Sequence, residues 1–230
     1  MNRCVECGVP VGPRSRLCLR HAAANARRSM ALLRESNAAA SEQLMRSWFG
    51  LGTEDVAKEL GLPISVVNTH LAETLAAKSR ATASHGSDDD LQTTVLDLGV
   101  RLAAEITSLS GQRYSVDYLR ISGETVIPLG VLATEPRPKF PLSEHPFLME
   151  MVATGQPVAG ELRNRRLGER ARSLAARLRI VAGGGVPVKV KGSVHGILSL
   201  STAGVQPSHA LLQHIGVVAR IIEIALAHHH

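Results

Sequence analysis

Hydrophobic positions along the chain predict a helical N-terminal third, followed by alternating helices and strands. Residues 91–109 and 207–226 each predict a long amphipathic helix, because apolar side chains recur every three or four residues. In the first of these helices the apolar positions are Val95, Leu98, Leu102, Ile106 and Leu109. Shorter helices are expected over 22–36, 41–49 (with Ser41 as its N-cap), 143–154 and 170–178.

Strand-like alternation appears in two pairs of segments, each around a short turn that contains glycine. The paired segments are 113–121 with 125–133, and 186–190 with 194–200. Residues 156–162 predict a further short strand. Gly183-Gly184-Gly185 precede the second pair. They predict a flexible turn, because the spacings of known phosphate-binding loops are absent.

Residues 53–78 have the pattern of two short helices joined by a tight turn. Thr53 is expected to cap the first helix, and the second helix is expected to begin near Ile64 or Ser65. Ala57 would allow close packing, Gly61 would take the left-handed turn, and Val67 would pack between the helices.

The segment Val67-Asn68-Thr69-His70-Leu71 resembles the second helix of LuxR-type and sigma-factor-type helix-turn-helix motifs. The resemblance covers about 25 residues, and the first helix departs from the LuxR pattern. It implies DNA contacts by residues of this second helix: Ser65, Val66, Asn68, Thr69, His70 and Lys78. The alternative is a helical hairpin that packs on protein.

Three cysteines and a histidine in the first 21 residues have the spacing of a zinc site. They follow the pattern C-x2-C-x10-C-x2-H, and the chain has no other cysteine. Zinc prefers four thiolate or imidazole ligands at tetrahedral corners. We therefore expect a structural zinc knuckle with Zn2+ as the bound metal. Its ligands would be Cys4, Cys7, Cys18 and His21. The alternative is three free thiols and a surface histidine.

Net charge adds a second indication for the N-terminal region. The chain carries a formal charge of +6, and residues 14–34 hold six arginines and no acidic residue. Such a segment favours phosphate contact, with Arg27 and Arg28 as candidates for DNA binding. The alternative is a solvated helix face rich in arginine. Absence of an 18-residue apolar run or a signal peptide favours a cytoplasmic location.

The C-terminal part resembles a GAF domain in its order of elements and in several short motifs. These are His145-Pro146-Phe147-Leu148, Gly155-Gln156-Pro157-Val158, Val186-Pro187-Val188-Lys189-Val190-Lys191-Gly192 and Gly196-Ile197-Leu198-Ser199-Leu200. The resemblance implies an α+β fold, with an antiparallel sheet, a small-molecule pocket on one face and helices on the other. It also implies a sensor or dimerisation module, whose effector the sequence does not identify.

No catalytic set emerges from the spacing of polar residues. Asp117 and Glu124 are isolated acids, and four single histidines predict ordinary surface or core positions. These are His145, His195, His209 and His214. A binding protein is therefore favoured over an enzyme with a hidden site in the pocket.

Together these features predict a DNA-binding transcription regulator that forms a homodimer through its long helices. The alternative is an adaptor that grips a protein such as RNA polymerase. The predicted organisation is a zinc knuckle with a basic helix (1–36), a helix-turn-helix (37–80), a linker (81–90), a GAF-like sensor and dimerisation domain (91–227) and a tag remnant (228–230).

Overall fold

The computed structural model describes residues 2–3, 10–11, 39–47, 49–81, 88–129, 138–164 and 166–228. The chain divides into two compact units, Met1–Leu44 and Met45–His230. In the first unit, strands β1 (Asn2–Arg3) and β2 (Pro10–Val11) pair antiparallel. Several predicted site residues lie outside the described residues. They are Cys4, Cys7, Cys18, His21, Arg27 and Arg28.

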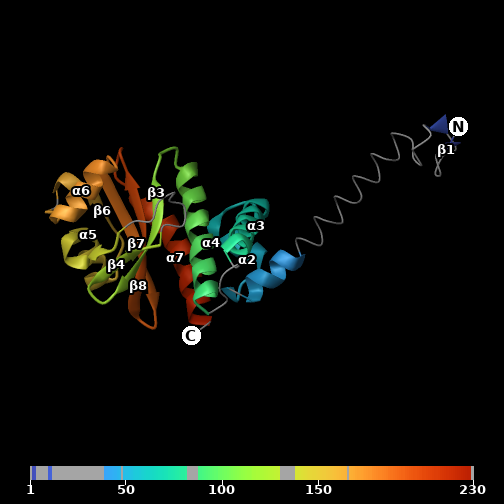
Figure 1. Cartoon of the computed structure of the whole chain (residues 1–230), viewed down its shortest axis with the longest axis horizontal. Helices are drawn as coiled ribbons and strands as arrows, with labels where there is room; N and C mark the ends of the chain where they lie inside the picture. The colour runs from blue at the N-terminus through green and yellow to red at the C-terminus, as the bar shows by residue number, and fades with distance from the viewer. Residues whose placement is uncertain are drawn as a thin grey trace. The chain divides into compact units, whose positions relative to one another are not determined.

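A six-stranded antiparallel sheet forms the centre of the second unit, as the predicted α+β class requires (Figure 1). Its spatial order is β5-β4-β3-β8-β7-β6. The strands are β3 (Ser115–Ser122), β4 (Thr125–Pro128), β5 (Phe140–Pro141), β6 (Val158–Glu161), β7 (Ala182–Val190) and β8 (Ser193–Thr202). The two predicted hairpins are confirmed as β3–β4 and β7–β8.

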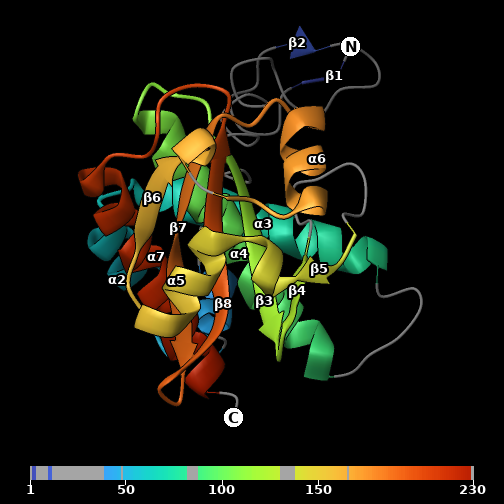
Figure 2. The same cartoon turned by 90° about the vertical axis from the view of Figure 1, so that its left-hand side faces the viewer.

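Helices cover both faces of this sheet. On one face lie α4 (Asp88–Leu109) and α7 (His209–His228), side by side (Figure 1). On the other lie α5 (Pro146–Thr154) and α6 (Glu169–Arg177) (Figure 2). The 3-10 turn η1 (Leu142–Glu144) precedes α5 in the chain, and the 3-10 turn η2 (Leu162–Asn164) follows β6. The side chains of β3 alternate between the two faces of the sheet. Val116 and Tyr118 face α4 and α7, whereas Leu119 packs with α5.

Helix α7 bears on the expectation that the chain has no membrane span. Its segment His209–Ala227 is long and apolar enough by composition. However, Ile215, Val218 and Ile222 are fully buried against the rest of the unit. The apolar character of α7 is that of a core helix between the sheet and its neighbours.

The three consecutive glycines do not form the predicted turn. Gly183, Gly184 and Gly185 lie inside β7, paired with β6 on one side and β8 on the other. A Cβ atom on Gly184 would lie 2.7 Å from the Val158 carbonyl oxygen. Glycine is therefore required here because neighbouring strands approach too closely for a side chain.

Two further helices, α2 (Thr53–Leu60) and α3 (Ile64–Ala81), belong to the same compact unit as the sheet. Helix α3 packs on α4, and α2 packs on α7. The predicted domain boundary at 81–90 therefore lies within one unit, and α4 already begins at Asp88. Since α2 and α3 cover apolar surface of α4 and α7, that surface no longer argues for a dimer; dimerisation stays a prediction.

Candidate functional site

The α2–α3 pair has the close packing that its sequence pattern predicts. Ala57 and Val67 are buried, and Gly61 ends α2 in the left-handed conformation, with φ of 64°. The predicted cap is wrong, because Thr53 is the first helical residue and Gly52 is the N-cap. The carboxylate of Asp55 accepts a hydrogen bond from the Gly52 N–H at 3.2 Å, so the side chain at the third helical position supplies the capping interaction.

The helix 41–49 needs a similar correction at its start. Helical backbone is already present at residues 39 and 40, so Ser41 lies inside the helix and is not its N-cap. Met45 and Phe49 are fully buried. The helix was therefore predicted correctly, although its start was not.

The residues proposed for DNA contact divide into two groups on α3. Ser65 and Thr69 are exposed, and the Thr69 hydroxyl donates to the Ser65 carbonyl oxygen at 2.8 Å. Val66 and Asn68 are half-buried, and the Asn68 Oδ1 atom is buried without a hydrogen-bond partner. Lys78 lies in α3, but its side chain is outside the described residues.

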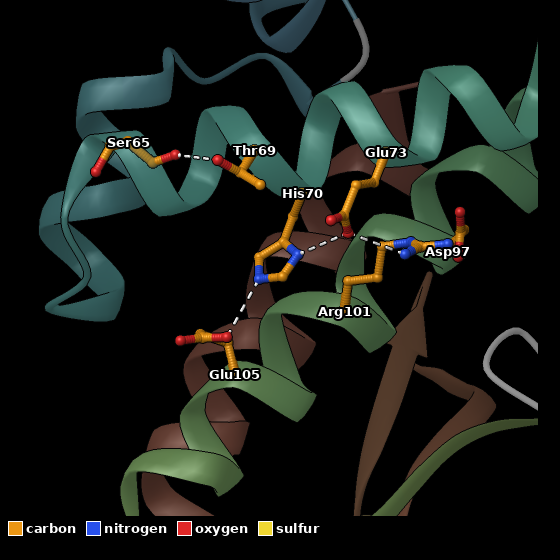
Figure 3. Close-up of polar contacts among 7 residues, drawn as sticks. All are labelled: Ser65, Thr69, His70, Glu73, Asp97, Arg101 and Glu105. Atoms are coloured by element: carbon orange, nitrogen blue, oxygen red, sulfur yellow. Dashed lines mark hydrogen bonds and ion pairs between the residues drawn. The ribbon is translucent and has the colours of Figure 1, made fainter.

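His70 turns towards α4 and takes part in a polar network between the two helices (Figure 3). Its Nδ1 lies 3.4 Å from Glu73 Oε2, and its Nε2 lies 3.4 Å from Glu105 Oε2. Arg101 of α4 binds the same Glu73 oxygen at 3.2 Å and Asp97 Oδ1 at 3.1 Å. Polar and ionic contacts therefore connect α3 to α4, in addition to the apolar packing between these helices.

Charge on the described part of the α2–α3 pair is predominantly negative. Between residues 53 and 75 there are four acidic side chains and one basic side chain. They are Glu54, Asp55, Glu59 and Glu73, with Lys58. Lys78 and Arg80 follow in the same helix and bring the net charge of residues 53–81 to −1. Because phosphate contact needs positive charge, this nearly neutral segment alone supplies little non-specific DNA affinity.

A cavity of about 700 Å³ lies on the sheet face opposite α4 and α7. Its floor comes from β3, β7 and β8, and its walls from α5 and α6. Apolar side chains dominate the part near α5: Leu119, Phe140, Phe147, Leu148 and Met151. Polar groups converge on the same space: Asp117, Ser173, Ser199, Ser201 and His145.

His145 is a polar group inside the apolar part of this cavity. It lies between Phe140 and Phe147, with ring centroids 6.3 and 6.1 Å away. Burial lowers the pKa of His145 to about 4, so the imidazole is neutral at pH 7. Its Nδ1 atom is buried and has no hydrogen-bond partner. A cavity of this size with a few convergent polar groups is typical of a small-molecule site.

Comparison with known proteins identifies the fold through solved structures. No protein-family model and no curated protein sequence matches the chain. The cyanobacteriochrome receptor PixJ matches with a TM-score of 0.50 and 15% identity, over 63% of this chain and 100% of that one. The GAF domain/HD domain protein from Geobacter sulfurreducens matches with a TM-score of 0.46 and 16% identity, over 60% and 95%. The free methionine-R-sulfoxide reductase from Neisseria meningitidis matches with a TM-score of 0.44 and 14% identity, over 67% and 87%.

Over about 63% of this chain the fold resembles that of the PixJ receptor, and the similar solved structures include GAF domains. At these identities the likeness concerns the fold alone. It agrees with the predicted antiparallel sheet, which has the cavity on one face as expected; unlike the prediction, helices lie on both faces.

Unlike His145, His195 makes ordinary side-chain contacts between β8 and its neighbours. Nδ1 of His195 lies 2.8 Å from the Tyr118 hydroxyl, and its Nε2 lies 3.4 Å from Gln92 Nε2. Among the residues that the structure describes, no group of three or more His, Cys, Asp or Glu side chains could hold a metal ion.

Two features of the GAF domain were missed by the sequence analysis. His145 was placed among ordinary histidines, although it lines the cavity. Residues 163–179, which include α6, hold seven arginines and one acidic residue. A count of charges in a moving window would have found this segment, whereas the position of His145 depends on the tertiary fold.

Proposed function

We propose that this protein is a cytoplasmic transcription regulator, in which α2 and α3 form a helix-turn-helix and the GAF domain binds a small-molecule effector. The observation that carries the proposal is the direct packing of α2 and α3 on α7 and α4. Helices α4 and α7 in turn cover one face of the sheet, and the opposite face of the same sheet forms the cavity. An effector that alters the sheet therefore has a short physical route to the helix-turn-helix.

DNA binding is tested by selecting bound sequences from random duplexes with the full-length protein. Ser65→Ala and Asn68→Ala should each reduce the free energy of binding to the selected sequence by about 1–3 kcal/mol, while the affinity for non-specific duplexes stays the same. Ser193→Ala, at an exposed serine in the β7–β8 hairpin, is the matched control. Equal affinities for all three variants at the selected site would refute the assignment of α3 as the recognition helix.

The second candidate is an adaptor that binds a protein. The excess of acidic residues over 53–75 favours it, because a negative face repels phosphate and suits a basic partner. Salt dependence separates the two functions. A regulator with Arg27 and Arg28 on phosphates should lose duplex affinity steeply with rising salt, and changing both arginines to alanine should flatten the slope. If the protein does not bind duplex DNA even at low salt, the regulator function is refuted and the adaptor function remains.

The proposal includes a zinc ion held by Cys4, Cys7, Cys18 and His21, for which the spacing is the support. Protein purified without chelator should contain one zinc per chain. Cys18→Ala should lose it, and His209→Ala, outside the quartet, should keep it. Metal-free wild-type protein with reduced thiols would contradict the site.

The proposal retains a homodimer that binds a palindromic site, since one helix-turn-helix contacts too few base pairs for specificity. Sedimentation of the full-length protein at micromolar concentration tests it. A monomeric protein that still selects a non-repeated DNA sequence would refute dimerisation, while the proposed role as a transcription regulator would remain.

A further inference from the structure

One of the two most positive segments of this protein lies beside the cavity of the GAF domain; the other is residues 14–34. Residues 163–179 carry seven arginines against one glutamate, which equals the net charge of +6 of the whole chain. Arg163 and Arg170 are 77% and 74% exposed. Within the described part of the chain, Arg166, Arg177 and Arg179 have no carboxylate within ion-pair distance. These arginines are therefore available to an anion.

Helix α6 directs two of these arginines to the cavity. Arg170 and Arg177 are seven residues apart, which is close to two helical turns, so they lie on the same face of α6. Both line the cavity, with Ser173 and Leu174 between them. Lys139, just before β5, adds a third cation.

Acidic groups are also present, but they leave this edge positive. Glu169 lines the cavity from the first turn of α6, and Glu144 Oε1 lies 4.0 Å from Arg170 Nε. Asp117 lies in the sheet floor and is buried. The three cations are exposed, as is expected at the solvent end of the cavity.

The buried end of the cavity has a different chemistry. Phe147, Leu148 and Met151 are almost fully buried there, and His145 leaves its Nδ1 without a partner. An unpartnered buried polar atom costs free energy, which a ligand with one complementary polar group would offset.

We propose that the cavity binds an amphipathic organic anion. Its ring-bearing apolar body would lie against Phe147, Leu148 and Met151, and its carboxylate, sulfonate or phosphate would bind Arg170 and Arg177. The inference rests on the proposed function, because it assigns a chemical class to the same effector. Arginine suits this role, since its planar guanidinium binds such groups through two parallel hydrogen bonds.

Two fluorescent dyes test the proposal with the full-length protein. 8-Anilino-1-naphthalenesulfonate and N-phenyl-1-naphthylamine share the same aromatic skeleton and differ in the sulfonate. The wild-type protein should bind one molecule of either dye per chain, and the anionic dye should bind more tightly. The double variant Arg170→Gln with Arg177→Gln should lower the affinity for the anionic dye about tenfold and the affinity for the neutral dye less than twofold. Arg220→Gln, at a 72% exposed arginine on α7, should change neither affinity.

The outcomes separate this inference from the function on which it rests. If neither dye binds the wild-type protein, the cavity is not an effector site. If the double variant weakens both dyes equally, or neither, the anionic class is wrong while the cavity stands. Loss of duplex DNA binding by the double variant, with dye binding unchanged, would assign the arginine segment to nucleic acid and overturn the proposal.

Discussion

Arg101→Gln is the sharpest test of the contact between α3 and α4. The arginine is 19% exposed and binds Glu73 and Asp97, which are 51% and 14% exposed. The pair with Glu73 is solvated and contributes about 0.2–1 kcal/mol. The pair with Asp97 is more buried, and a charge-assisted hydrogen bond there contributes about 1.5–3 kcal/mol. We expect a loss of about 2 kcal/mol in the free energy of unfolding, or about 4–8 °C in Tm.

This loss should depend on pH through Asp97. Burial raises the pKa of Asp97 above its ordinary value of 3.8, and Arg101 opposes this rise. A carboxyl whose pKa is higher in the folded state binds more protons there, so stability falls as the pH rises through that pKa. Removing Arg101 raises the pKa of Asp97 further. The effect of Arg101→Gln should therefore be larger at pH 7 than at pH 4.

Urea unfolding at these two pH values measures the effect, with Arg220→Gln as the matched control. Arg220 is 72% exposed and lies 3.3 Å from Glu223, so its loss should cost less than about 0.5 kcal/mol. Adding Asp97→Asn to Arg101→Gln should recover stability at pH 7, because the buried carboxylate is removed and only the half-exposed Glu73 has lost its arginine partner. The reasoning is refuted if Arg101→Gln costs no more than the control, or costs the same at both pH values.

Two further predictions concern helix packing and the cavity. Gly99→Ala should destabilise the protein by about 1 kcal/mol in urea unfolding, because the new Cβ would lie 2.4 Å from Ile222 Cδ1 and the resulting strain exceeds the gain in helix propensity. Gly216→Ala, with nothing within 4 Å of the new Cβ, should instead stabilise by about 0.5–1 kcal/mol; the same sign for both changes would contradict the close α4–α7 approach. His145→Gln should reduce the loss of stability between pH 6.5 and about 4, since burial lowers the pKa of His145 to about 4 and only the unfolded imidazole takes up a proton over this range. An unchanged pH profile would place His145 in solvent.

Local patterns predicted the helices and hairpins well, because each depends on side-chain spacing within one segment. The glycine turn between α2 and α3 is one example. Four of the five apolar positions predicted for α4 are also buried, whereas the fifth, Leu109, is 68% exposed at the end of the helix. The same reasoning failed for Gly183-Gly184-Gly185. Alone, three glycines favour a turn, but pairing with β6 and β8 holds them in a strand. Such pairing involves residues 14 to 27 positions away, and no local window contains it.

The cavity could be expected only as part of the resemblance to GAF domains. Its lining residues are far apart in the sequence, from Asp117 on β3 to Ser201 on β8. The same limit applies to His70. Its place in the second helix was predicted, but its orientation towards Glu105 depends on how α3 packs on α4. Side-chain roles that depend on packing between helices therefore required the structure.

A physical link between the cavity and the α2–α3 pair follows from the alternation of side chains along β3. Asp117 and Leu119 line the cavity, while the intervening Tyr118 faces the helices on the other side. The Tyr118 hydroxyl contacts His195 of β8, and His195 contacts Gln92 of α4, which packs on α3. A ligand that displaces β3 by a fraction of an ångström therefore also moves Tyr118, because adjacent residues share one backbone. If the proposed function holds, Tyr118→Phe should leave dye affinity unchanged and weaken the effect of the dye on DNA binding.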